Sequence, residues 1–185
     1  NSFCAGTSVT FTAGGLGKNF EVRVNGVSVQ NGASTAYTTT GLTNGQVVDV
    51  IVTNAGGCAA TSSGITNAVL ALPVPTLTSS DADNTFCTGT SVTFTAGGGS
   101  NYSFRVNGSS VQNGASATYI TSTLSNGEIV DVIVTNAGGC IGTSAGKTNT
   151  VNPLPANAGV IIGAPTVCQG QSAVAYSVPA IANAT

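Results

Sequence analysis

The chain has no histidine, no tryptophan and no methionine, and charged side chains make up only 5% of its 185 residues. Histidine is the commonest general base and metal ligand near neutral pH, so its absence argues against an enzyme and against a zinc site. The net charge is −2 without a basic patch, which argues against nucleic acid as a partner. No apolar run approaches the roughly 18 residues of a membrane-spanning helix. The sequence therefore predicts no catalytic residue, no cofactor site and no membrane span.

The chain instead contains an alternation of apolar and polar residues. Hydrophobic residues make up 41% of it, which is more than a disordered chain usually carries. Phe20, Val22 and Val24 alternate with Glu21 and Arg23, the period of a half-buried β-strand. Glycine, serine, threonine, asparagine and valine dominate, while helix-forming leucine, lysine and glutamate are scarce. This composition predicts an all-β fold.

An internal repeat organises the chain. The segment 48–58, Val-Asp-Val-Ile-Val-Thr-Asn-Ala-Gly-Gly-Cys, returns unchanged at 130–140. The opening Asn-Ser-Phe-Cys at 1–4 returns as Asn-Thr-Phe-Cys at 84–87. The second copy is one residue shorter, in the glycine-rich loop near Lys18, where a deletion leaves strand register intact. The repeat predicts a tandem array of small β-sandwiches.

Proline-containing joints separate the copies, at 72–75 and at 153–155. Proline stiffens an extended connection, so these segments are interpreted as short semi-rigid linkers. We expect a first repeat at 1–73, a second at 74–155 and, at 156–185, the truncated start of a third repeat of another subtype. The chain begins without methionine or a signal peptide, so we interpret it as a processed product or a part of a longer protein.

Asn-Gly pairs mark the expected turns of the first repeat. Asn25-Gly26 lies between two alternating runs and predicts a type I′ hairpin, since both central positions need positive φ. Asn31-Gly32 and Asn44-Gly45 predict two further turns, the second of which leads into the strand that begins near Val48.

Five cysteines are present: Cys4, Cys58, Cys87, Cys140 and Cys168. The simplest pairing places one disulfide in each repeat, Cys4–Cys58 and Cys87–Cys140, and leaves Cys168 unpaired. Each bridge would add about 4 kcal/mol in the chain-entropy model, and bridges imply an oxidising compartment. The alternative is five buried free thiols. A zinc site is disfavoured because the chain has no Cys-x-x-Cys spacing.

Three motifs resemble a known family: Phe-Cys-x-Gly-Thr-Ser-Val-Thr-Phe-Thr-Ala-Gly-Gly, then Arg-Val-Asn-Gly, then Val-Thr-Asn-Ala-Gly-Gly-Cys. They look like the immunoglobulin-like (Ig-like) and PKD-like repeats of giant secreted surface proteins of Bacteroidetes, including gliding-motility adhesins. Val-Cys-Gln-Gly-Gln-Ser at 167–172 is similar to the PKD-like subtype. The resemblance implies tandem Ig-like sandwiches, type IX secretion, and a role in adhesion or in filaments on the bacterial cell surface.

Two acidic residues in the first joint are candidate metal ligands. Asp81 and Asp83 could bind calcium at the boundary between repeats and stiffen it. Calcium takes six to eight oxygen ligands, however, and the second joint has no acidic pair. The alternative is a solvated linker without metal.

Two Arg–Asp pairs are candidate surface sites. If Val48, Val50 and Val52 face inward, Asp49 faces outward beside Arg23. Arg105 and Asp131 take the same places in the second copy. Each pair is interpreted as a cross-strand ion pair, with a ligand-binding pair as the alternative. The four tyrosines (Tyr37, Tyr102, Tyr119 and Tyr176) are interpreted as core and edge residues; the alternative is stacking on sugars.

These observations favour a structural protein. We expect a stalk or spacer of a long extracellular filament or surface adhesin, whose partners are neighbouring repeats and further copies of itself in a fibre. The alternative is a carbohydrate- or calcium-binding accessory module of a secreted enzyme.

Overall fold

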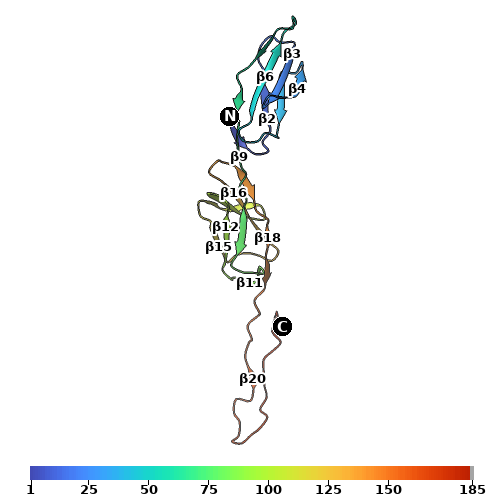
Figure 1. Ribbon diagram of the computed structural model, residues 1–185. Coiled ribbons are helices and arrows are strands. Elements are labelled where there is room, and N and C mark those ends of the chain that lie inside the picture. The colour runs from blue at the N-terminus through green and yellow to red at the C-terminus, as the bar shows by residue number, and fades with distance from the viewer. Residues whose placement is uncertain (184–185) are drawn as a thin grey trace.

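The computed structural model describes residues 1–183 and places two β-sandwich repeats end to end, followed by an extended tail (Figure 1). All regular elements in these residues are strands. The two repeats and the tail follow one long axis, so the molecule is a rod (Figure 1). No helix in the described residues could cross a membrane.

Repeat 1 is built of nine strands. They are β1 (Ser2–Cys4), β2 (Val9–Thr12), β3 (Asn19–Val24), β4 (Val27–Gly32), β5 (Ala36–Thr39), β6 (Val47–Thr53), β7 (Ala59–Thr61), β8 (Ile65–Thr66) and β9 (Ala68–Leu70). One sheet has the order β4-β3-β6-β7, and β8 also pairs with β6. β2 pairs with β5 and β1 runs parallel to β9.

Repeat 2 is built of ten strands. They are β10 (Thr76–Ser79), β11 (Thr85–Cys87), β12 (Val92–Gly97), β13 (Asn101–Val106), β14 (Ser109–Gly114), β15 (Thr118–Thr121), β16 (Ile129–Thr135), β17 (Ile141–Thr143), β18 (Lys147–Thr148) and β19 (Thr150–Asn152). The sheet β14-β13-β16-β17 reproduces that of repeat 1, but the facing sheet has three strands, β10-β12-β15. Both repeats are all-β sandwiches.

The turn chemistry explains the hairpins. Asn25 (φ 49°) and Gly26 (φ 80°) both have positive φ, as the type I′ turn between β3 and β4 requires. The expected turn at Asn31-Gly32 is wrong, because β4 continues through Gly32, which pairs with Phe20 of β3. Ladder pairing along β3 therefore overrides the local Asn-Gly preference.

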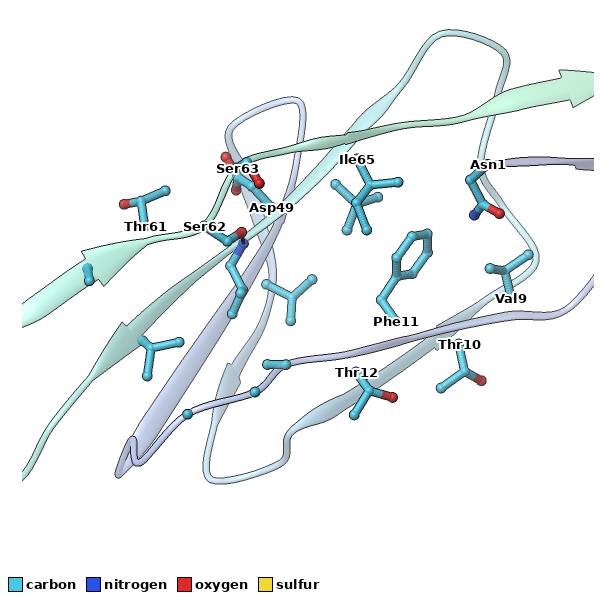
Figure 2. A pocket seen from close by; sticks show the side chains of 18 residues that line it. Asn1, Val9, Thr10, Phe11, Thr12, Asp49, Thr61, Ser62, Ser63 and Ile65 are labelled. Atoms are coloured by element: carbon cyan, nitrogen blue, oxygen red, sulfur yellow. Dashed lines mark hydrogen bonds between the residues drawn. The ribbon is translucent and has the colours of Figure 1, made fainter.

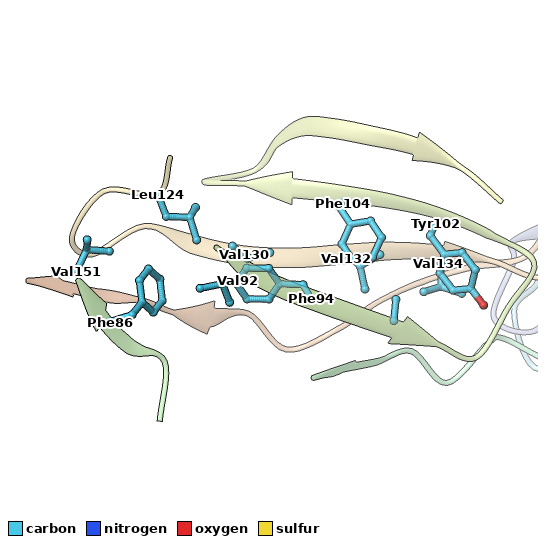
Figure 3. Close-up of a cluster of buried hydrophobic side chains, with 11 residues drawn as sticks. Phe86, Val92, Phe94, Tyr102, Phe104, Leu124, Val130, Val132, Val134 and Val151 are labelled. Atoms are coloured by element: carbon cyan, nitrogen blue, oxygen red, sulfur yellow. The ribbon is translucent and has the colours of Figure 1, made fainter. Parts of the chain in front are cut away.

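The core of repeat 2 is a continuous apolar layer between its two sheets (Figure 3). Phe94, Phe104, Val132 and Val134 are 0% exposed. The valines come from alternate positions of β16, as the sequence pattern predicts. Leu77 of β10 packs against the same cluster.

The core of repeat 1 is much smaller, although most of its residues recur in repeat 2; at one core position, Val22 stands where repeat 2 has Phe104. Only Val22, Leu42 and Val48 form its buried cluster, and Phe11 and Val50 are half-buried around them. Repeat 1 has no described strand in the place that β10 takes in repeat 2. Residues matched in sequence therefore differ in burial because their neighbours differ.

The tail continues from repeat 2 as a long loop that folds back on itself (Figure 1). Its only regular structure in the described residues is the pair β20 (Ile162–Gly163) and β21 (Tyr176–Ser177). Val160 and Ile161 are largely exposed, so this tail has no sandwich core of its own.

Candidate functional site

A disulfide joins the two repeats. Cys4 at the end of β1 is bonded to Cys140 at the start of the segment leading into β17, with 5.6 Å between their Cα atoms. The predicted bridges Cys4–Cys58 and Cys87–Cys140 are wrong. The cysteines form a link between repeats, and Cys58 and Cys87 are free and exposed.

The position of each cysteine in its repeat explains the error. β1 pairs with β9 at the end of repeat 1 that faces repeat 2, whereas Cys58 follows the far end of β6 (Figure 1). The seven residues of β6 hold these ends roughly 20 Å apart. Cysteines whose Cα atoms are more than about 7 Å apart cannot form a disulfide without backbone movement. A bridge inside one repeat is therefore excluded by the fold.

The turn that carries Cys140 is fixed by Asn136. Its side-chain oxygen accepts hydrogen bonds from the backbone N–H groups of Gly138 and Cys140, each at 3.0 Å. Its side-chain N–H donates to the carbonyl of Ala71, the last residue before the linker, at 2.9 Å. One asparagine thus shapes the cysteine turn and binds the preceding repeat. The motif Asn-Ala-Gly-Gly-Cys is a docking turn, a role that its repetition alone did not reveal.

The linker packs closely against glycines of repeat 2. A Cβ on Gly142 would lie 2.9 Å from the carbonyl oxygen of Pro73, and one on Gly97 would lie 2.7 Å from Oγ1 of Thr76. A Cβ on Gly98 would collide with the carbonyl of Val74. The linker predicted from its prolines is therefore packed along repeat 2, and it leads directly into β10.

The five cysteines fall into two classes by their turns. Cys4, Cys87 and Cys168 each accept a hydrogen bond at their carbonyl from the N–H three residues on, at 3.0–3.1 Å, around a glycine of positive φ. Cys58 and Cys140 end the Asn-Ala-Gly-Gly-Cys turn. The observed disulfide joins one cysteine of each class. Cys168 is free and exposed, like Cys58 and Cys87.

A groove of about 1010 Å³ opens along the edge of β2 in repeat 1 (Figure 2). Val9, Phe11 and Ala13 line one wall, and Val50 and Val52 of β6 line the floor. Phe11 points from β2 into the groove (Figure 2). The lining is mostly apolar and also includes threonine and serine residues.

The two predicted Arg–Asp pairs are present on the outer face of the larger sheets. Arg23 donates from Nε and Nη2 to the two carboxylate oxygens of Asp49, both at 2.8 Å. Arg105 and Asp131 form the same bidentate pair at 2.7 and 2.6 Å. Each arginine lies directly opposite its aspartate in the antiparallel ladder. Because the paired groups bind one another, this geometry favours the ion-pair interpretation over a ligand site.

Hydrogen bonds from Arg23 hold the pKa of Asp49 below its usual 3.8, against an opposing effect of partial desolvation. A carboxylate whose pKa is lower in the folded state stabilises that state above the unfolded pKa. That contribution is lost as the pH falls through the folded value. Exposed pairs contribute little, so the effect will be modest.

We therefore expect the melting temperature of repeat 1 to fall on acidification below about pH 4, more in the parent chain than in Asp49→Asn. Repeat-resolved NMR melts at several pH values will measure this. An equally steep acid dependence in both chains would contradict it.

The two acidic residues of the joint do not gather into a metal cage. Asp81 and Asp83 each accept a hydrogen bond from the backbone N–H of Thr85, at 2.9 and 3.0 Å. In residues 1–183, no three acidic, cysteine or histidine side chains cluster as metal ligands. Both carboxylates thus accept hydrogen bonds within the turn that leads into β11.

The aromatic and amide side chains have structural contacts. Tyr37 stacks on Phe11, and the hydroxyl of Tyr102 donates to the carbonyl of Gly99 at 2.7 Å. Asn67 is 0% exposed and donates to the carbonyls of Gln46 and Ile65, each at 3.0 Å. The burial of Asn67 was not predicted from the sequence. The recurrence of Asn67 as Asn149 in the second copy was the available signal.

The chain matches no protein-family model and no curated protein. Among solved structures, it is similar to the fibronectin(III)-like modules of CbhA from Clostridium thermocellum, at 14% identity, TM-score 0.47, and 81% and 87% coverage of the two chains. It is also similar to an amphioxus IgVJ-C2 molecule, at 17% identity, TM-score 0.35, and 81% and 99% coverage. A third is SGBP-B of a Bacteroides ovatus mixed-linkage glucan utilization locus, in complex with a mixed-linkage heptasaccharide, at 16% identity and TM-score 0.25. That match covers 82% of this chain and 42% of the SGBP-B chain.

Proposed function

We propose that this chain is a structural segment of an extracellular filament or surface adhesin, in which it acts as a stalk or spacer and carries load along its length. The observation that carries the proposal is the Cys4–Cys140 bridge between the repeats. A covalent bond across a joint fixes the spacing of two modules. Neither of its cysteines belongs to the apolar core cluster of a repeat.

The surfaces of the chain agree with this role. The outer face of each larger sheet carries an Arg–Asp pair with both charges neutralised. The disulfide fits an oxidising compartment such as the cell exterior. A non-catalytic role, assembly with copies of itself and delivery by type IX secretion are parts of the proposal that rest on composition and on the family resemblance.

Small-angle scattering in solution tests the proposal. We expect a rod whose longest dimension matches two sandwiches end to end with the tail extending beyond them, unchanged by dilution. A compact particle would overturn the stalk proposal.

A glycan array tests the alternative function. The groove of repeat 1 has threonine and serine residues in its lining and Phe11 inside it, features that a sugar site also uses. We expect no specific binding by the isolated chain. Binding of one glycan class that is lost in Phe11→Ala would favour the accessory carbohydrate-binding module instead.

A further inference from the structure

The two repeats differ in burial even at positions where their sequences agree. Phe94 and Val134 are 0% exposed in repeat 2, whereas the matching Phe11 and Val52 are only half-buried. Phe94 and Val134 belong to the core cluster of repeat 2, whereas Phe11 and Val52 both line the groove of repeat 1. The exposed edge of repeat 1 is the groove described above.

In repeat 2, that edge is covered by β10. Leu77 pairs with Ala96 of β12 and packs against the apolar core. Ala96 corresponds to Ala13 of repeat 1, which lines the open groove. The groove therefore has the length, direction and apolar floor needed to bind one extended strand whose leucine side chain points inward. We call this binding surface the strand seat.

Glycines in repeat 1 also match those that the linker approaches in repeat 2. Gly97 and Gly98 have Thr76 and Val74 so close that a Cβ could not fit. Their counterparts Gly14 and Gly15 have no other atom within 4 Å of such a Cβ. Gly14 has no positive φ that would require glycine. By analogy with Gly97 of repeat 2, glycine at this position would leave room for another segment to approach closely.

The cysteine turn provides an independent observation. Asn54 shapes its turn as Asn136 does, accepting hydrogen bonds from the N–H groups of Gly56 and Cys58 at 2.9 and 3.0 Å. Asn136 also donates to the preceding repeat, and Cys140 is bonded to it. In residues 1–183, Asn54 makes no such bond between repeats, and Cys58 is a free, exposed thiol.

We propose that the outer end of repeat 1 is the acceptor half of this same joint, and that its partner is another repeat of this type. The partner's linker adds to β2 as a strand along the groove. Its first cysteine, the counterpart of Cys4, forms a disulfide with Cys58. Cys87 is the matching donor cysteine of repeat 2.

The bond forms by thiol oxidation. Two thiols lose two protons and two electrons, and a disulfide oxidant such as oxidised glutathione accepts them and becomes two thiols.

One residue of repeat 1 departs from the pattern of repeat 2: Ala60 stands at the position of Gly142, which makes room for Pro73. The incoming linker must therefore lie slightly farther out at that point.

The strand seat is tested with a synthetic peptide of residues 73–80, Pro-Val-Pro-Thr-Leu-Thr-Ser-Ser. NMR of the labelled full chain is expected to show shifts along β2 and β6 of repeat 1 and none along β12, where β10 is already paired. The melting temperature of repeat 1 is expected to rise by at least about 4 °C at saturation. Shifts in both repeats, or in neither, would overturn the strand seat.

Two variants provide controls for the peptide. A peptide with Leu77→Asp is expected to cause no shifts, because a carboxylate would enter the apolar floor. Gly14→Val in the full chain should fold, since the space around Gly14 is open, and should abolish binding of the parent peptide. Equal binding by the Asp peptide would also overturn the proposal.

The disulfide is tested by mixing two variants that both carry Cys168→Ser. One also carries Cys58→Ser and the other Cys87→Ser, so only Cys87 of the first and Cys58 of the second are free. In a glutathione redox buffer, we expect the Cys87–Cys58 dimer at least about tenfold above either homodimer, identified by mass spectrometry. Random thiol oxidation would give the three dimers in similar amounts and would overturn the proposal.

This inference rests on the proposed role as a stacked repeat, but the two can fail separately. A compact particle in scattering would reject the stalk even if the peptide binds. A rod that binds no peptide and forms no Cys87–Cys58 dimer would keep the stalk and reject this joint.

Discussion

Replacing Cys4 with serine is expected to lengthen the fully stretched chain by about 450–490 Å when it is pulled from its two ends. The bridge closes a loop with a sequence separation of 136 residues, and an extended residue spans about 3.3–3.6 Å. In the parent chain, tension passes from Cys4 to Cys140 through the disulfide. The enclosed residues of both repeats therefore cannot extend.

Single-molecule force spectroscopy under non-reducing conditions measures this difference. Cys140→Ser should behave as Cys4→Ser does, because either change breaks the same bond. Cys58→Ser is the matched control and should leave the stretched length unchanged, since Cys58 is free in the structure. A parent chain that extends as far as Cys4→Ser would show that the bridge does not form.

The same substitution should also lower stability. For a loop of this length, the chain-entropy model gives a loss of about 5 kcal/mol in the free energy of unfolding. The loop includes parts of both repeats, so both unfolding transitions should shift. Denaturant titration with separate NMR probes in each repeat will measure the loss.

The second large effect is expected from Phe94→Ala. Phe94 is 0% exposed in the core of repeat 2, and truncation of a buried phenylalanine typically costs about 3–5 kcal/mol. The matched change Phe11→Ala should cost roughly 1–2 kcal/mol, because Phe11 is only partly buried in the groove.

Denaturant unfolding of the two variants tests this comparison, with each repeat followed separately. The two phenylalanines occupy matching positions of β2 and β12, so the contrast measures the effect of β10 together with that of the facing residue, which is Val22 in repeat 1 and Phe104 in repeat 2. Equal costs would mean that the groove of repeat 1 is closed in solution.

The sequence alone determined the local structure of this protein. The alternation of Phe20, Val22 and Val24 specified which side chains of β3 face inward. Asn25-Gly26 specified a hairpin because few other residues adopt positive φ at both central positions. The pairing of Arg23 with Asp49 followed from the same alternation once the strands were neighbours.

Only the tertiary structure decided which cysteines pair and which edge is covered. The sequence specifies five cysteines, but pairing depends on distances between strand ends, and β6 separates Cys4 from Cys58. Phe11 and Phe94 have the same local sequence, yet only Phe94 has β10 beside it. Local patterns specify strands and turns through short-range sterics, whereas burial and disulfide pairing depend on residues brought together from distant parts of the chain.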